Sequence, residues 1–199
     1  SSVDGLKVTA TAIADGSQVA KAEGAAGEKF YIPIKNPRLW CPEDPFLYDL
    51  KLELRNKRGQ VVDLVDSYFG MRSVELGKVG GITRTLLNGQ FVFYLGLLDQ
   101  GYWPDGVFTA PPEDALLYDI ELARRTGFNV IRKHIKVEPQ RWYYHCDRLG
   151  VIVWQDMPNL WEPDLPDSVA LRAQFRTELK EMIDQHISSP SIVMWVPFN

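Results

Sequence analysis

From about residue 91 onward, apolar strand patterns alternate with amphipathic helix patterns, and no other feature restricts the fold of this 199-residue chain as strongly. Strands are predicted at 91–98, 128–134, 151–156 and 191–199. Helices are predicted between them at 111–127, 138–150 and 167–187. Buried strands that alternate with helices form parallel sheets covered by helices. An open doubly wound sheet and a closed barrel of eight strand–helix units both satisfy this pattern.

The residues that follow the predicted strands separate these two architectures. A nucleotide-binding doubly wound sheet would carry a Gly-rich turn after its first strand, and the sequence DQGYWPDG at 99–106 lacks that spacing. Polar or aromatic residues instead follow every strand. In a barrel the carboxyl ends of the strands meet on one face, where active sites lie. We therefore expect residues 79–199 to form the N-terminal half of a (β/α)8 TIM barrel, truncated after about four strands.

Residues 1–78 follow a different pattern, that of short antiparallel strands. Strands are predicted at 7–14, 29–34, 46–56 and 61–70. The last two flank a Lys57-Arg58-Gly59 turn and are expected to pair as a hairpin. Several short strands without a helical period predict an antiparallel sandwich. Trp40 is interpreted as a structural residue of this sandwich.

Composition and charge argue against several classes of partner. The chain carries 22 basic and 26 acidic side chains, for a net charge of −4, which does not favour a nucleic acid. The longest apolar run is far shorter than the ~20 residues that span a bilayer, so no membrane partner is expected. Cys41 and Cys146 match neither a disulfide framework nor a zinc motif and are interpreted as free.

Six passages carry a family likeness that covers nearly the whole chain. They are NPRLWCPEDPFLYDLKLEL at 36–54, YFGMRSVEL at 68–76, LLNGQFVFYLG at 86–96, GFNVIRKH at 127–134, YHCDRLGVIVWQD at 144–156 and SPSIVMWVPFN at 189–199. Together they resemble glycoside hydrolase family 2, the family of β-galactosidases, β-glucuronidases and β-mannosidases. The first two passages are similar to the family's immunoglobulin-like domain, and the others to its catalytic barrel and the short hairpin that opens it. The resemblance therefore implies an immunoglobulin-like β-sandwich over residues 1–78.

The resemblance also implies a reaction, which is retaining hydrolysis of terminal β-linked sugars by a β-galactosidase-like enzyme with carbohydrate as its partner. In the family the fourth barrel strand ends in Asn-Glu, where the Glu is the acid/base, and the nucleophile lies on a later strand. Asn199 matches that Asn, so both catalytic carboxylates are expected beyond these residues, and the chain alone is expected to be inactive. A non-catalytic carbohydrate-binding or structural module on the same fold is the alternative. The residue after Asn199 would distinguish the two.

Four residues at predicted strand ends are candidate sugar contacts. In the family, an Asn at the place of Asn199 bonds the sugar 2-hydroxyl, and an Arg at the place of Arg132 braces the catalytic carboxylates. Arg132 could also form a structural ion pair with Asp99 or Asp156, which are themselves candidates for binding sugar hydroxyls. Galactosidase-like members end the third strand in Asp-Glu, whereas this chain has Gln155-Asp156. No metal or other cofactor is therefore expected.

Further aromatic and histidine side chains are predicted near the same face. His134 is a candidate sugar contact, although family members place this His one position later, and a helix cap or surface position is the alternative. Trp103 is expected either to stack on a pyranose ring or to pack on the barrel rim. Trp195 is a candidate floor of the sugar pocket and Trp161 a candidate wall, whereas Trp154 is predicted to be core.

Half a barrel would leave its first and fourth strands unpaired on one side. Open edges and exposed apolar faces invite pairing with another chain, so self-association is expected. The sequence shows neither a signal peptide nor an initiator Met, and we expect it to begin inside a longer precursor. A bacterial periplasmic or secreted location fits such a parent, and a cytoplasmic location stays open.

Overall fold

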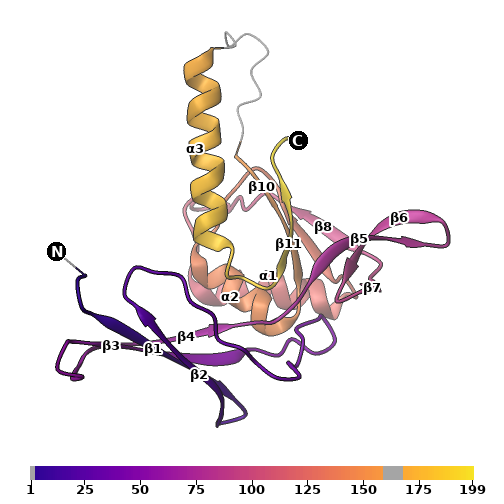
Figure 1. Ribbon diagram of the computed structural model, residues 1–199. Coiled ribbons are helices and arrows are strands. Elements are labelled where there is room, and N and C mark those ends of the chain that lie inside the picture. The colour runs from indigo at the N-terminus through magenta and orange to yellow at the C-terminus, as the bar shows by residue number, and fades with distance from the viewer. Residues whose placement is uncertain (1–2, 159–167) are drawn as a thin grey trace. The chain divides into compact units, whose positions relative to one another are not determined.

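The computed structural model describes residues 3–158 and 168–199. The chain divides into two compact units, which can be followed by residue number in Figure 1. The first unit comprises Ser1–Leu39 and Phe46–Met71. The second unit comprises Trp40–Pro45 and Arg72–Asn199. The short segment 40–45 thus interrupts the first unit in sequence and belongs to the second.

Four antiparallel strands form the sheet of the first unit, in the order β2-β1-β3-β4. They are β1 Lys7–Ala14, β2 Ser17–Ala25, β3 Tyr48–Arg55 and β4 Val61–Phe69. In the turn between β3 and β4, Asn56 Oδ1 accepts hydrogen bonds from the amides of Arg58 and Gln60, and Gly59 adopts a φ of 77°. The predicted hairpin is confirmed.

The predicted strand at 29–34 is not formed. These residues carry no strand ladder, and the described residues of the unit make a single sheet, so the second sheet of the predicted sandwich is not among them. Partly buried and exposed side chains still alternate along the segment, which is why its sequence resembles a strand. Phe30 packs on the sheet, since a Cβ on Gly24 would lie 2.3 Å from its ring. Pro33 has no N–H to donate to a neighbouring strand.

Four parallel strands form the main sheet of the second unit, in the order β11-β10-β9-β8. They are β8 Gly96–Asp99, β9 Val130–Lys133, β10 Ile152–Asp156 and β11 Ile192–Val196. The connecting helices are α1 Glu113–Arg125, α2 Gln140–Leu149 and α3 Val169–His186. Within the described residues, the predicted succession of four parallel strands and three helices is confirmed, although the first strand is shorter than predicted. Each strand lies beside its neighbour in sequence, without a reversal of order.

The single buried strand predicted at 91–98 is wrong in two respects. The chain is divided there between β7 Gln90–Phe91 and β8, and β7 belongs to a separate antiparallel sheet with β5 Val74–Val79 and β6 Ile82–Leu87. Apolar side chains of this stretch are exposed, Phe93 by 68% and Leu98 by 57%. Phe93 lies between β7 and β8, and Leu98 pairs with Arg132, on the face of the sheet away from the helices. The hairpin predicted near 86–96 is confirmed as the β6–β7 pair.

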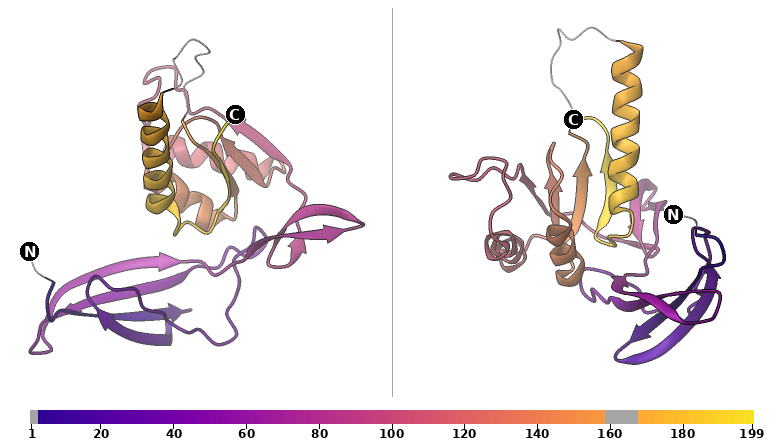
Figure 2. Two further views of the ribbon diagram at one scale, coloured as in Figure 1. Left: turned by 45° about the horizontal axis from the view of Figure 1, so that its top comes forward. Right: turned by 90° about the vertical axis from the view of Figure 1, so that its left-hand side faces the viewer.

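The core of the second unit lies between the parallel sheet and its helices. Ile131 and Val153 of the strands pack with Ile120, Trp142 and Cys146 of the helices in one buried cluster. The longest helix, α3, runs alongside β11, as both views of Figure 2 show. Because successive strand side chains point to opposite faces, every second residue of these strands points away from this core.

Trp40 is fully buried in the second unit, although the sequence predicts it as part of the sandwich. Its indole Nε1 donates to the carbonyl of Asp147 at 2.6 Å, and Asn88 Nδ2 donates to the Trp40 carbonyl at 3.0 Å. Asp147 Oδ1 in turn accepts from the Ser191 amide at 2.9 Å. Trp40 therefore links the β6–β7 turn to α2, and Asp147 links α2 to the residue before β11.

Both cysteines are free, as predicted. Cys146 lies in the core, where burial raises the pKa of its thiol. This thiol is accordingly a small apolar core group. Within residues 3–158 and 168–199, none of the helices combines the length and the apolar character needed to cross a membrane.

Candidate functional site

Arg132, Asp156 and Asn199 meet at the carboxyl ends of three neighbouring strands, and we call them the strand-end cluster. Arg132 lies in β9, Asp156 ends β10, and Asn199 follows β11. Arg132 Nε donates to Asp156 Oδ1 at 3.0 Å, and its Nη2 donates to Asp156 Oδ2 at 2.9 Å. Nη2 also donates to Asn199 Oδ1 at 2.9 Å. The register explains the meeting: Arg132 pairs with Trp154, so Asp156, two residues further, lies on the same face.

The ion pair in the strand-end cluster is bidentate, with a buried carboxylate and a partly exposed guanidinium. The side chain of Asp156 is 2% exposed and that of Arg132 is 28% exposed. The hydrogen bonds to Asp156 raise the pKa of Arg132 above its ordinary value. A planar guanidinium matched to a carboxylate fixes orientation as well as charge. The pair therefore places a fixed cation beside Asn199, whose amide nitrogen can donate to a ligand oxygen.

An open groove of about 220 Å³ lies beside Arg132. Tyr94, Leu98 and Trp154 help to line it. The rings of Tyr94 and Trp154 meet edge to face, with centroids 5.6 Å apart and planes at 89°. The sequence predicts Trp154 as core, but it is partly buried and shares the groove with Arg132. The alternation along β10 is the sequence signal that would have placed it there.

Asp99 lies on the other face of the sheet from the strand-end cluster. The register pairs Asp99 with Lys133, and Lys133 Nζ contacts Asp99 Oδ2 at 2.5 Å. Neighbouring residues of a strand point to opposite faces, so Lys133 and Asp99 lie toward the helices while Arg132 does not. The ion pair predicted for Arg132 with Asp99 or Asp156 is confirmed, and its partner is Asp156.

The contact between Lys133 and Asp99 belongs to a buried charge network that sequence reasoning missed. Lys133 Nζ also donates to Glu138 Oε1 at 3.0 Å, and Lys136 Nζ lies 3.1 Å from the same oxygen. Lys136 Nζ further donates to the Gly101 carbonyl at 2.8 Å. The side chains of Lys133 and Glu138 are each 1% exposed. A lysine within an apolar strand, followed closely by a glutamate, is the signal that could have indicated this network.

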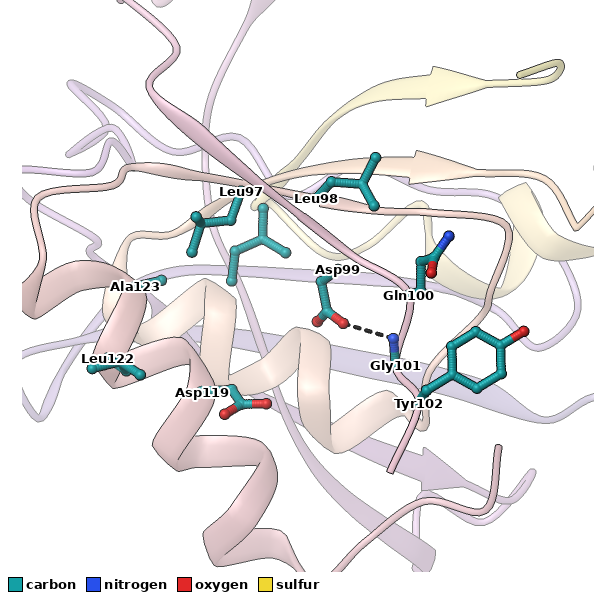
Figure 3. A pocket seen from close by; sticks show the side chains of 10 residues that line it. Leu97, Leu98, Asp99, Gln100, Gly101, Tyr102, Asp119, Leu122 and Ala123 are labelled. Carbon is teal, nitrogen blue, oxygen red and sulfur yellow. Dashed lines mark hydrogen bonds between the residues drawn. The ribbon is translucent and has the colours of Figure 1, made fainter. Parts of the chain in front are cut away.

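A second pocket, of about 390 Å³, lies between β8 and α1 (Figure 3). Leu97 and Leu122 supply part of its apolar lining, and Asp99 and Asp119 supply two carboxyl groups. Asp99 Oδ1 accepts from the Gly101 amide at 2.7 Å, as Figure 3 shows. Burial, and then the negative charge of Asp99, raise the pKa of Asp119. This pocket adjoins the unpaired edge of β8, apart from the strand-end cluster.

The other side chains predicted at the site do not join the strand-end cluster. His134 Nδ1 lies 3.1 Å from Gln100 Nε2, just beyond the end of β8. Trp103 and Trp195 pack against the buried cluster between sheet and helices, and for Trp103 this agrees with the packing alternative to sugar stacking. Trp161 lies outside the described residues. In residues 3–158 and 168–199, no group of three or more His, Cys, Asp or Glu side chains could hold a metal ion.

The parallel sheet in sequential order, covered by helices, makes the second unit an α/β unit, and the charged cluster lies at the carboxyl ends of its strands, where barrel enzymes hold their active sites. Residues 2–72 match the family model described as Glycosyl hydrolases family 2. A relative from Formosa agariphila is 32% identical over 180 residues, which are 90% of this chain and 21% of that protein. The chain belongs to glycoside hydrolase family 2, and the resemblance stated above is confirmed.

Two further similarities agree with this membership. The beta-galactosidase of Psychromonas ingrahamii is 27% identical over 188 residues, which are 90% of this chain and 18% of that enzyme. The structure of Bacteroides uniformis beta-glucuronidase 2, covalently bound to cyclophellitol-6-carboxylate aziridine, matches 96% of this chain and 23% of its own length. Its TM-score is 0.79 at 26% identity. The chain thus spans about a fifth of the length of these relatives.

Proposed function

We propose that the chain is part of a retaining β-glycosidase, with the parallel sheet as the first half of a catalytic (β/α)8 barrel and the first unit as an immunoglobulin-like domain. The strand-end cluster carries this proposal, because barrel enzymes hold their active sites at the carboxyl ends of the strands. The unreversed strand order supports a barrel over a doubly wound sheet, whose order reverses at a switch point.

The domain boundary predicted from the sequence, between residues 78 and 79, falls within β5. We propose instead that the boundary lies between Met71 and Arg72, where the two compact units divide.

The proposed reaction needs two carboxyl groups about 5–5.5 Å apart. One protonates the leaving oxygen while the other attacks the anomeric carbon, and water, deprotonated by the first group, then releases the sugar from the covalent intermediate. The family resemblance puts the acid/base glutamate directly after Asn199 and the nucleophile on a later strand. In this proposal the 199 residues bind and orient the sugar, and the carboxylates beyond them hydrolyse it.

Each member of the strand-end cluster has a distinct proposed role. Asn199 donates its amide N–H to the sugar 2-hydroxyl, a contact that strengthens in the transition state. Arg132 supplies a fixed positive charge beside the acid/base carboxylate, and Asp156 holds the guanidinium in place. His134 stays a candidate sugar contact at the end of β9. Three earlier candidates are not included in the proposed sugar site because they lie on the helix side of the sheet: Asp99, Trp103 and Trp195.

Hydrolysis of aryl β-glycosides tests this proposal. The longer protein, continuing past Asn199, is expected to turn over at least one of an aryl β-glucuronide, β-galactoside or β-mannoside. The 199-residue chain at the same concentration is expected to show no turnover. Sugar binding without turnover by the longer protein would favour a non-catalytic carbohydrate-binding module instead. Enzyme-proportional turnover by the 199-residue chain would overturn the assignment of the catalytic pair.

We also propose that the 199-residue chain on its own self-associates through the open edges of the parallel sheet, which are strands β8 and β11. In the described sheet, β8 and β11 each pair with a neighbour on one side only. Unpaired edges and exposed apolar side chains such as Leu98 favour pairing with another chain. Static light scattering is expected to give a mass that exceeds the 22.7 kDa of one chain and rises with concentration.

Two lysine substitutions make this prediction specific. Leu98→Lys puts a charge on the β8 edge and is expected to shift the mass toward that of one chain. Ile187→Lys changes an exposed apolar residue just after α3 and is expected to leave the mass as it was. A constant monomer mass for the unmodified chain, up to the highest soluble concentration, would contradict the proposal.

A further inference from the structure

The chain beyond β11 is held by contacts that are not part of the strand ladder. The carbonyl of Val196 accepts from the Met157 amide at 2.8 Å, which anchors the last residue of β11. Pro197 has no N–H and cannot extend the ladder. The ring of Phe198 then stacks on the ring of Phe175 from α3, with centroids 5.2 Å apart and planes at 7°. The next residue along the chain belongs to the strand-end cluster.

The helix that carries Phe175 is capped at its start and buried near its end, while most of the residues between are exposed. At its start, Ser168 Oγ accepts from the Leu171 amide at 3.1 Å and caps the helix. Near its end, Met182 and His186 are buried, and the His186 ring lies 4.4 Å from the ring of Tyr143 in α2. The stack therefore connects the chain after β11 to a helix that is buried near its other end.

We propose that Phe175 is a positioning residue for Asn199. The stack restrains the backbone of Phe198 and thereby sets where the Asn199 side chain meets Arg132, with Oδ1 2.9 Å from Nη2. A displacement of about 1 Å in an orienting group can cost on the order of 10²-fold in rate. The catalytic part of this inference rests on the proposed sugar contact of Asn199, whereas the structural part does not.

The structural part is tested in the 199-residue chain by ¹⁵N relaxation of the Phe198 and Asn199 amides. The unmodified chain is expected to give order parameters of about 0.85 for these two amides, as in a rigid backbone. The Phe175→Ala variant is expected to lower both order parameters below about 0.6. Phe175→Tyr keeps the ring and is expected to keep the order. Leu171→Ala removes a half-exposed apolar side chain one turn earlier on α3 and is the matched control, expected to change neither amide.

The catalytic part is tested in the longer protein with an aryl β-glycoside that it hydrolyses. Phe175→Ala is expected to lower kcat about tenfold or more while KM changes less, because the 2-hydroxyl contact strengthens in the transition state. Phe175→Tyr is expected to restore most of kcat. A longer protein without any glycosidase activity would overturn the proposed function alone, since the order parameters would still decide the role of the stack.

Several results would overturn the positioning role. They are a mobile Asn199 amide in the unmodified chain, unchanged order in Phe175→Ala, or an equal loss of order in Leu171→Ala. If Phe175→Ala loses helical circular dichroism, Phe198→Ala removes the same stack while leaving α3 intact. That variant must then show the same loss of order at Asn199, and a rigid Asn199 in it would reject the proposal.

Discussion

Glutamine in place of the glutamate expected directly after Asn199 should lower kcat of the longer protein by about 10²–10⁴-fold, with little change in KM. A positioned carboxylic acid contributes a factor of this order by protonating the leaving oxygen as the glycosidic bond breaks. The amide of glutamine has nearly the same shape but cannot give up a proton, so binding should survive while the chemical step slows. Steady-state kinetics on the aryl β-glycoside that is hydrolysed fastest would measure both constants.

The dependence on the leaving group sharpens this test. A strongly acidic phenol leaves without help from an acid, so the loss of kcat/KM caused by glutamine should be small for a dinitrophenyl glycoside and large for an unsubstituted phenyl glycoside. The kcat for the dinitrophenyl glycoside should still fall, because the same group acts as the base when water releases the sugar from the covalent intermediate. Glu121→Gln makes the same chemical change at an exposed position of α1 and should leave both rates unaltered. A loss of kcat/KM that is equal for the two leaving groups would argue against an acid/base role for that glutamate.

Trp40→Ala is expected to lower the free energy of unfolding of the second unit by about 3–5 kcal/mol. Removing a large buried aromatic side chain costs this much, because the transfer of the ring and the cavity left behind both contribute. Trp40 is fully buried, and its Nε1 bond to the Asp147 carbonyl is lost as well. Urea denaturation followed by helical circular dichroism reports on this unit, because the three described helices all lie within it.

Two further variants separate the contributions to the Trp40 result. Trp40→Phe keeps much of the ring but leaves the Asp147 carbonyl without its buried donor, and should cost about 1–3 kcal/mol. Tyr31→Ala removes an aromatic side chain that is 88% exposed in the first unit, and should change the stability by no more than about 0.5 kcal/mol. A Trp40→Ala midpoint close to that of the unmodified chain would show that segment 40–45 is not an anchor of the second unit.

The elements whose signals are local could be predicted from the sequence. The predicted helix 138–150 contains α2 Gln140–Leu149, which begins after Pro139 and ends at Gly150 with a φ of 71°. Proline at a helix start and glycine after its end act within one turn of chain, so no distant residue is needed to recognise them. The Lys57-Arg58-Gly59 turn predicted its hairpin for the same reason.

The candidate site was predictable only in part. Strand-end residues could be selected because polar side chains after apolar strands are visible in the sequence, and Arg132 with Asp156 was among the predicted pairs. Asp99 was an equal candidate, and the register excluded it by pairing Asp99 with Lys133 on the helix side. A shift of one residue along a strand moves a side chain to the other face of the sheet. Sequence periodicity therefore allowed either Asp99 or Asp156 as the ion-pair partner of Arg132.

By itself the sequence determined the order and kind of most elements and its membership of a glycoside hydrolase family, because periodicity, caps, turns and family motifs are carried by neighbouring residues. Only the tertiary structure decided that segment 29–34 packs without forming a strand, that Trp40 belongs to the second unit, and that Trp195 lies against the core. Each of these outcomes depends on strand register and on contacts between residues far apart in the chain, which no local pattern encodes.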